Sequence, residues 1–414
     1  MTATPRRTIA FLLLVAGTNI AAQSPPADRA ATIKFFEDRV ARDPDDIVAE
    51  NNLATLCLGK LRETGDFGWL KRARRAATQS LASVAAARNV GGLEMLTQVE
   101  YESHHFLEAR DLALQLTKLD PNRSYPFAFL GDAWLEFGEI GPAAAAYAEM
   151  NQRRSPPIES ESRLARLALA RGQLDEAAVH HRAAVQAARN LFPPRPEAVV
   201  WALVQLGQLA FSRGDFATAE TQYKAALREQ TDDPHAIEHL GELRAAQGQW
   251  PEAISLYQRA IALTPRPEFI QALGDVYAAS GDSSEAEQWH YRARDSYLKN
   301  VKDGNDHYFH HLAGYYADVE ENAAEAVKWA RRDMELRHTG AAHDALAWAL
   351  YRSGELSAAA NEAQAALKTG TRDAHILFHA AMILLAAGDA AKGRDLLANA
   401  AKVNPRYTAF HVHR

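Results

Sequence analysis

Hydrophobic and small residues return at a fixed interval along Trp201–Pro265. Leu206-Gly207 is followed by Leu240-Gly241, and 240 − 206 = 34. The same offset relates Gly214 to Gly248, Ala219 to Ala253, Tyr223 to Tyr257 and Ala226 to Ala260. A period of roughly 20–50 residues is typical of stacked-repeat architectures. The pattern therefore predicts one structural unit that is written twice.

Each copy is predicted to be two helices joined by a turn. In the first copy the helices are Val199–Ser212 and Phe216–Glu229, and Gly214 lies between them, where a helix ends and positive φ is needed. Gly207 is small, so it lets the two helices approach closely. Tyr223 is large and is expected to fill the gap toward the next unit.

A unit of this kind cannot bury its apolar face alone, so neighbouring units must bury it for one another. The order Leu-Gly, turn Gly, Ala, Tyr, Ala and a closing Pro265 resembles the tetratricopeptide repeat family. The resemblance implies a right-handed superhelix of helix-turn-helix units. It also implies that the first helix of each unit lines a concave side where peptides bind.

Related signals extend over residues 32–405 and predict an all-α, right-handed α-solenoid of about ten units. Turn glycines repeat elsewhere at the same period, as at Gly354 and Gly388, where 388 − 354 = 34. Irregular joins are expected near 190–198, where three prolines occur, and near 295–306. We expect a disordered leader at 23–31, a C-terminal tail at 406–414 with a disordered His411-Val412-His413, and no separate catalytic domain.

The first 22 residues are interpreted as an export signal. Arg6-Arg7 supplies the positive start, Ile9–Ala16 the short apolar run and Ile20–Ala22 a cleavage site after Ala22. We expect a periplasmic or secreted bacterial protein with no membrane span in the mature chain. The single cysteine, Cys57, lies between leucines and is predicted to be buried rather than reactive.

Charge and composition argue against several classes of function. The net charge is −6 and the pI about 6.3, and the one basic run, Lys71–Arg75, is interpreted as a solvated helix face, so we expect no nucleic-acid partner. The sequence also lacks a Gly-rich phosphate loop, a Gly-x-Ser-x-Gly elbow and a CxxC pair. We therefore expect a non-enzymatic protein without a cofactor.

Three units carry histidine pairs spaced i, i+4, which places both imidazoles on one helix face. Neutral imidazole is the commonest transition-metal ligand, so these pairs are candidate metal ligands. The alternative is that histidine merely tolerates a half-exposed helix surface. Alternate units lie about 20 Å apart at about 10 Å per helix layer, so the pairs are not expected to form one site. The pairs are His235 and His239, His307 and His311, and His375 and His379.

The segment His235–His239 also matches the H-x-x-E-H signature of inverted zinc proteases. In that interpretation two histidines hold zinc and Glu238 activates water. A third ligand and a substrate-binding body are not evident, so zinc hydrolysis is kept only as a minor alternative.

The leading hypothesis is an exported scaffold that binds a peptide or protein segment in its concave groove. Transition-metal-dependent binding through the histidine pairs is the alternative. Trp201 and Trp348 are the expected partner anchors, unless they pack between neighbouring first helices. The groove candidates are Tyr125, Asp132, Arg163, Arg166, Trp201, Gln208, Glu242, Asp275, Trp348, Tyr351 and Phe378.

Overall fold

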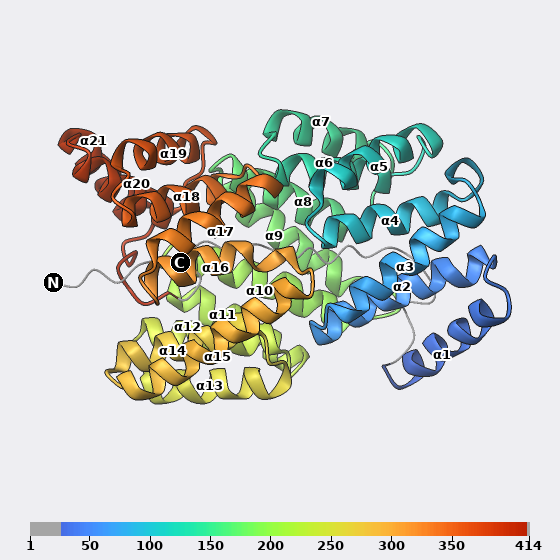
Figure 1. Cartoon of the computed structure of the whole chain (residues 1–414), viewed down its shortest axis with the longest axis horizontal. Helices are drawn as coiled ribbons and strands as arrows, with labels where there is room; N and C mark the ends of the chain where they lie inside the picture. The colour runs from blue at the N-terminus through green and yellow to red at the C-terminus, as the bar shows by residue number, and fades with distance from the viewer. Residues whose placement is uncertain (1–25, 412–414) are drawn as a thin grey trace. The chain divides into compact units, whose positions relative to one another are not determined.

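The computed structural model describes residues 26–411, and its regular structure in this range is entirely helical (Figure 1). These residues form two compact units, 26–160 and 161–411, and the chain passes from one to the other within α8. The export signal predicted at 1–22 lies outside the described residues.

The first unit contains α1 (Pro26–Arg42), α2 (Ile47–Thr64), α3 (Gly68–Ser83), η2 (Ala86–Arg88), α4 (Val90–Glu102), α5 (Phe106–Leu119), α6 (Tyr125–Glu136) and α7 (Ile140–Asn151). Then follow α8 (Pro157–Ala170), α9 (Leu174–Arg189), α10 (Pro196–Ser212), α11 (Phe216–Glu229), α12 (Pro234–Ala246), α13 (Trp250–Leu263), α14 (Pro267–Ser280) and α15 (Ser283–Lys302). The last elements are η3 (Asp306–Tyr308), α16 (Phe309–Asp318), α17 (Ala323–Leu336), α18 (Gly340–Arg352), α19 (Leu356–Lys368), α20 (Ala374–Ala386) and α21 (Ala390–Val403).

From α2 onward the helices of residues 26–411 follow one another in chain order as ten helix pairs, α2/α3 to α20/α21, with α1 preceding them, and the two helices pack on one another in pairs such as α2/α3, α10/α11 and α20/α21. The first helices of several neighbouring hairpins also contact one another, as α10 does α12 and α18 does α20. The prediction of an all-α solenoid with about ten units is therefore confirmed.

The hairpin turns need a residue in the left-handed region. Gly214 and Gly248 take φ values of 75° and 74° there, as the repeat pattern predicts. In the two turns without glycine, His104 (φ 63°) and Glu321 (φ 51°) adopt the same conformation. The turn backbone is thus the same although the residue type differs. A side chain other than hydrogen makes this left-handed conformation less favourable by about 1–2 kcal/mol.

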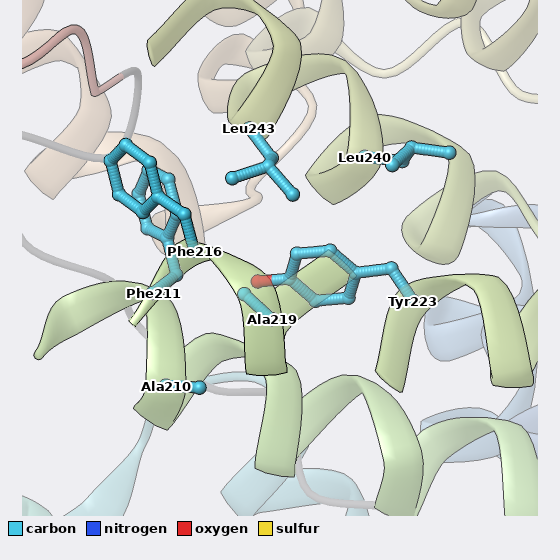
Figure 2. Packing of buried hydrophobic residues seen from close by; sticks show 7 residues of the cluster. All are labelled: Ala210, Phe211, Phe216, Ala219, Tyr223, Leu240 and Leu243. Carbon is cyan, nitrogen blue, oxygen red and sulfur yellow. The ribbon is translucent and has the colours of Figure 1, made fainter. Parts of the chain in front are cut away.

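Small residues at the helix crossing make room for large rings. A Cβ atom added to Gly207 would lie 2.4 Å from the ring of Tyr223, which is fully buried. Figure 2 shows Tyr223 beside Leu240 and Leu243 of the next hairpin. Full burial of a side chain of this size contributes about 1.5–3 kcal/mol. Tyr223 reaches the next hairpin, as predicted, and the structure adds that its ring also packs on Gly207 of its own hairpin.

Cys57 occupies the core of α2 in the first unit. The thiol is completely buried, and burial raises its pKa to about 12. Because the thiolate is the reactive form, this side chain acts as a small hydrophobic residue, as predicted.

Two predicted irregular segments turn out differently from one another. Residues 190–195 separate α9 from α10, so the proline-rich insert does end the helix. The expected join at 295–306 is wrong over its first part, because α15 continues without a break to Lys302. The leader expectation is wrong for residues 26–31, which belong to α1.

The end of the second unit returns to earlier hairpins of the same unit. A Cβ atom at Gly172, in the turn after α8, would lie 2.3 Å from the carbonyl oxygen of Gly370. A Cβ atom at Gly214 would similarly lie 2.4 Å from the side-chain oxygen of Asn404. We call residues 404–411 the C-terminal segment. The expectation of a disordered His411 is wrong, since this side chain is buried; Val412 and His413 lie outside the described residues.

Candidate functional site

The first helices of successive hairpins form the layer on which the predicted groove residues lie. Several of these side chains are buried rather than open to a ligand. Asp132 accepts a hydrogen bond from the Tyr147 hydroxyl at 2.8 Å, and Arg163 and Glu242 are each about 1% exposed. The half-buried members are Tyr125, Arg166, Trp201, Gln208, Asp275, Tyr351 and Phe378.

Trp348 packs between neighbouring first helices. Its ring stacks on His379 of α20 at a centroid distance of 4.2 Å and on Tyr351 at 5.0 Å. Its indole nitrogen donates to Asp318 at 2.7 Å. With 8% of its surface exposed, Trp348 serves the contact between hairpins, which was the packing alternative for this residue.

Most histidines of the three pairs contact aromatic rings or a carboxylate close by. His307 lies in η3, 5.2 Å from the ring of His311, which in turn stacks on Tyr297. His379 is bonded through Nδ1 to Asp344 at 2.8 Å. His235 meets the ring of Phe269 edge-on.

The C-terminal segment contacts residues in or near two of these pairs, but the pairs do not come together as one group of ligands among residues 26–411. The His411 ring lies 4.7 Å from that of His375 in α20, and His411 Nδ1 contacts Glu242 in α12. Glu242 is in turn a neighbour of His239, whose Nδ1 lies 3.5 Å from Glu242 Oε2.

The H-x-x-E-H segment does not assemble as the protease signature requires. Glu238 and His239 come together with Glu242, and the candidate ligand atoms of the three lie within 4.8 Å of one another. His235 is directed at Phe269 instead. We call Glu238, His239, Glu242 and His411 the α12 cluster. Each of its four side chains is buried.

Local sequence explains how α12 places these groups. Asp233 caps the helix by accepting from the Ala236 amide at 2.8 Å, and Pro234 occupies the first turn, where its missing N–H costs nothing. Glu238 and Glu242 are four residues apart and so lie on one face. The Tyr257 hydroxyl donates to Glu238 at 3.2 Å, and burial, together with both carboxylates, holds the pKa of Tyr257 well above its usual range.

Sequence reasoning missed the C-terminal segment. Phe410 meets the ring of Trp250, Arg406 lies over the ring of Phe216, and Ala409 packs on the core cluster drawn in Figure 2. The aromatic residues Tyr407 and Phe410, three positions apart just after Pro405, were the available signal that this stretch has a packing partner.

Family models described as tetratricopeptide repeat match residues 158–228, 204–266 and 345–408. The chain is a tetratricopeptide-repeat protein. The matched regions include the two regular copies at Trp201–Pro265 and the last two hairpins. Repeats of this type indicate a protein–protein interaction scaffold, which agrees with the coarser part of the leading hypothesis.

The tetratricopeptide-repeat protein resembles several solved structures in fold. One is a tetratricopeptide repeat protein from Parabacteroides merdae, with a TM-score of 0.47, 15% identity and coverage of 61% of this chain and 93% of that one. Another is PilF of Pseudomonas aeruginosa, with a TM-score of 0.41, 15% identity and coverage of 50% and 91%. The Cut9-Hcn1 part of the APC/C gives 0.47, 16% identity and coverage of 92% and 65%. All three TM-scores are below 0.5, so these likenesses carry no functional argument.

A curated human relative, protein O-mannosyl-transferase TMTC1, is 39% identical over 88 residues. The aligned part is 21% of this chain and 10% of that protein. Because the tetratricopeptide-repeat protein spans about a tenth of that relative, the transferase activity in its name does not transfer to this chain. Repeats of this fold are typically non-enzymatic scaffolds. Within residues 26–411, every helix falls short of the length and hydrophobicity needed to cross a membrane.

Proposed function

We propose that this protein is an exported scaffold that binds an extended segment of a partner protein along its first helices. The observation that carries the proposal is the direct contact between first helices of successive hairpins, as between α10 and α12. In the second unit such contacts join α10 to α12 and α16 to α18 and α20, and an extended ligand can follow these first helices. Gly207 and the other small step residues keep this layer close to the second helices.

Half-buried side chains on this layer supply suitable chemistry. Trp201 and Gln208 lie on α10, and Tyr351 lies on α18. A half-buried aromatic ring can bury a partner side chain with little loss of conformational freedom, and amide groups can bond to an extended backbone. The proposed ligand is therefore an unfolded or extended protein segment rather than a small molecule.

Site-specific photo-crosslinking tests this assignment. A photoreactive amino acid at Gln208 or Tyr351 is expected to capture the same partner, because both positions lie on the first-helix layer. The matched control is Val179, a 56% exposed position on the second helix α9. Capture that is equal at Val179, or absent from both first-helix positions in native extract, would contradict binding along the first helices.

Export is the second part of the proposal, supported by the signal-like residues 1–22. Cleavage after Ala22 leaves Gln23 as the new N-terminus. Mass spectrometry of the protein recovered from bacterial envelope fractions is expected to find an N-terminal peptide that starts at Gln23. Recovery of the intact Met1 peptide from the cytoplasm would refute export and would leave the scaffold assignment standing.

A further inference from the structure

The last residue of the C-terminal segment lies against three first helices of the second unit. The His411 ring meets Phe211 of α10 edge-on at a centroid distance of 5.2 Å, and it lies 4.7 Å from the ring of His375 of α20. Its Nδ1 contacts Glu242 of α12, which is one of the predicted groove residues. His411 therefore occupies part of the layer on which the partner is proposed to bind.

The two residues before His411 pack on apolar side chains of the same hairpins. Phe410 meets the ring of Trp250 at a centroid distance of 5.9 Å and packs on the core cluster that contains Tyr257. Ala409 packs on the core cluster drawn in Figure 2, which α10, α11 and α12 build together. Three successive residues of the segment thus place a small side chain, an aromatic ring and an imidazole on one part of the array.

The C-terminal segment is anchored at a few positions and not along its whole length. Asn404 and His411 are 5% and 7% exposed, whereas Arg406 and Thr408 between them are exposed. The last helix, α21, ends at Val403, before the segment begins. The segment can therefore leave the array without breaking a helix.

We propose that the C-terminal segment is a built-in competitor for the partner protein, a proposal that rests on the scaffold function proposed above. The partner segment that displaces it carries a small residue, an aromatic residue and a side chain with a nitrogen donor in succession. These three take the positions of Ala409, Phe410 and His411, and the nitrogen donor bonds to Glu242. A few buried anchors of this kind carry most of the binding energy of an interface.

The attachment of the segment to the same chain makes it an effective competitor. A short tether holds a ligand at an effective concentration on the order of millimolar. When the binding-competent state is only a fraction of the population, the apparent affinity for a ligand falls by that fraction. The unaltered chain is therefore expected to bind its partner weakly until the segment is released.

Fluorescence anisotropy of a synthetic peptide with the sequence of residues 404–411 tests the proposal. The peptide is amidated, labelled at its N-terminus and titrated with the full unaltered chain and with the full-length double variant Phe410→Ala/His411→Ala. We expect the double variant to bind the peptide at least about tenfold more tightly, because its own segment no longer fills the site. A peptide with alanine in place of Phe410 should bind the double variant at least about tenfold less tightly.

The matched control is Thr408→Ala, at an exposed position of the segment, which should bind the peptide as the unaltered chain does. Hydrogen exchange guards against a folding defect, since added peptide should restore slow exchange at the Gly214 turn of the double variant. Equal peptide affinity in the unaltered chain and the double variant would overturn the proposal. Light scattering that shows a dimer of the unaltered chain but a monomer of the double variant would overturn it too, because the segment would then occupy a second copy.

Photo-crosslinking at Gln208 distinguishes this proposal from the scaffold function. Gln208 contacts His239, whose Nδ1 lies 3.5 Å from Glu242 Oε2, so a photoreactive group there reports on the site of His411. Partner capture from native extract should rise severalfold in the double variant and fall again when the peptide is added. Equal capture by both chains would overturn the competitor role and leave the scaffold assignment standing. Absence of capture by both chains, at Gln208 and at Tyr351, would contradict the scaffold function and with it the competitor role.

Discussion

The hairpins α10/α11 and α12/α13 share the same 34-residue pattern but lie in different surroundings. Gly214 in the first turn faces Asn404 and Pro405, whereas a Cβ atom at Gly248 in the second turn would meet nothing within 4 Å. The repeated residues therefore give both hairpins the same backbone. The residues outside the repeat pattern decide which other parts of the chain each hairpin contacts.

The positions between the repeated ones show this most directly. Val204, Gln205 and Gln208 of α10 correspond to Glu238, His239 and Glu242 of α12. The first set is neutral, and the second set supplies the three members of the α12 cluster that lie on the helix itself. A tetratricopeptide-repeat scaffold thus tolerates a change from amide to carboxylate at inner positions, provided that another part of the chain, here His411, supplies partners for the buried charge.

Removing residues 404–414 should cause the largest change in the difference in local stability between the two hairpins. Loss of Ala409, Phe410 and His411 exposes apolar surface on α10–α13 and is expected to lower the local free energy of unfolding there by about 3 kcal/mol. Hydrogen exchange followed by mass spectrometry should show faster exchange at the Gly214 turn and little change at the Gly248 turn. A chain that lacks only residues 412–414 is the control. Equal effects at the two turns would mean that the C-terminal segment does not distinguish the hairpins.

Alanine at the two helix-crossing glycines, Gly207 and Gly241, should give the second largest difference in stability between the hairpins. In Gly207→Ala the new Cβ atom would lie 2.4 Å from the buried ring of Tyr223, and this overpacking should cost about 2–3 kcal/mol. In Gly241→Ala the closest ring atom of Tyr257 is 3.2 Å away, so the cost should stay below about 1 kcal/mol. Thermal and urea unfolding of the two variants measure the difference. A larger cost at Gly241 would contradict the packing described for Tyr223.

The turn glycines give a smaller contrast. Alanine at either position takes a left-handed conformation at a cost of about 1 kcal/mol. Gly214→Ala also pushes against Asn404, so we expect about 1 kcal/mol more for it than for Gly248→Ala. Denaturant unfolding should reveal this excess, and it should vanish when residues 404–414 are absent. An excess that survives the truncation would show that it does not arise from contact with the segment.

Phenylalanine at the two core tyrosines should have the smallest effects. The Tyr257 hydroxyl donates to Glu238, so Tyr257→Phe should cost about 1–2 kcal/mol. The Tyr223 hydroxyl is buried without a hydrogen-bond partner among residues 26–411, so Tyr223→Phe should be neutral or slightly stabilising. Calorimetric unfolding at matched pH distinguishes the two. If Tyr257→Phe stabilised the protein, the hydrogen bond from Tyr257 to Glu238 would make no net contribution to the free energy of unfolding.

Much of the hairpin architecture could be predicted because the signals act over short distances. Phe216–Glu229 was predicted with the bounds that α11 has, and Gly214 was placed correctly in a left-handed turn. The continuation of α15 to Lys302 was missed because an Asn and a Gly nearby look like helix breakers. The candidate site was predicted only in part: Glu238, His239 and Glu242 were singled out, but for different roles, and His411 was expected to be disordered.

What the sequence by itself determined is the repeat: the hairpin helices, the turn glycines, the small Gly207 at the helix crossing and the large Tyr223 directed toward the next unit. These features depend on contacts inside one unit or between neighbours, and a 34-residue pattern records them. What only the tertiary structure decided is the meeting of Glu242 with His411, 169 residues further along the chain. That meeting follows from small rotations that accumulate over successive hairpins, and a pattern of local spacings does not specify their sum.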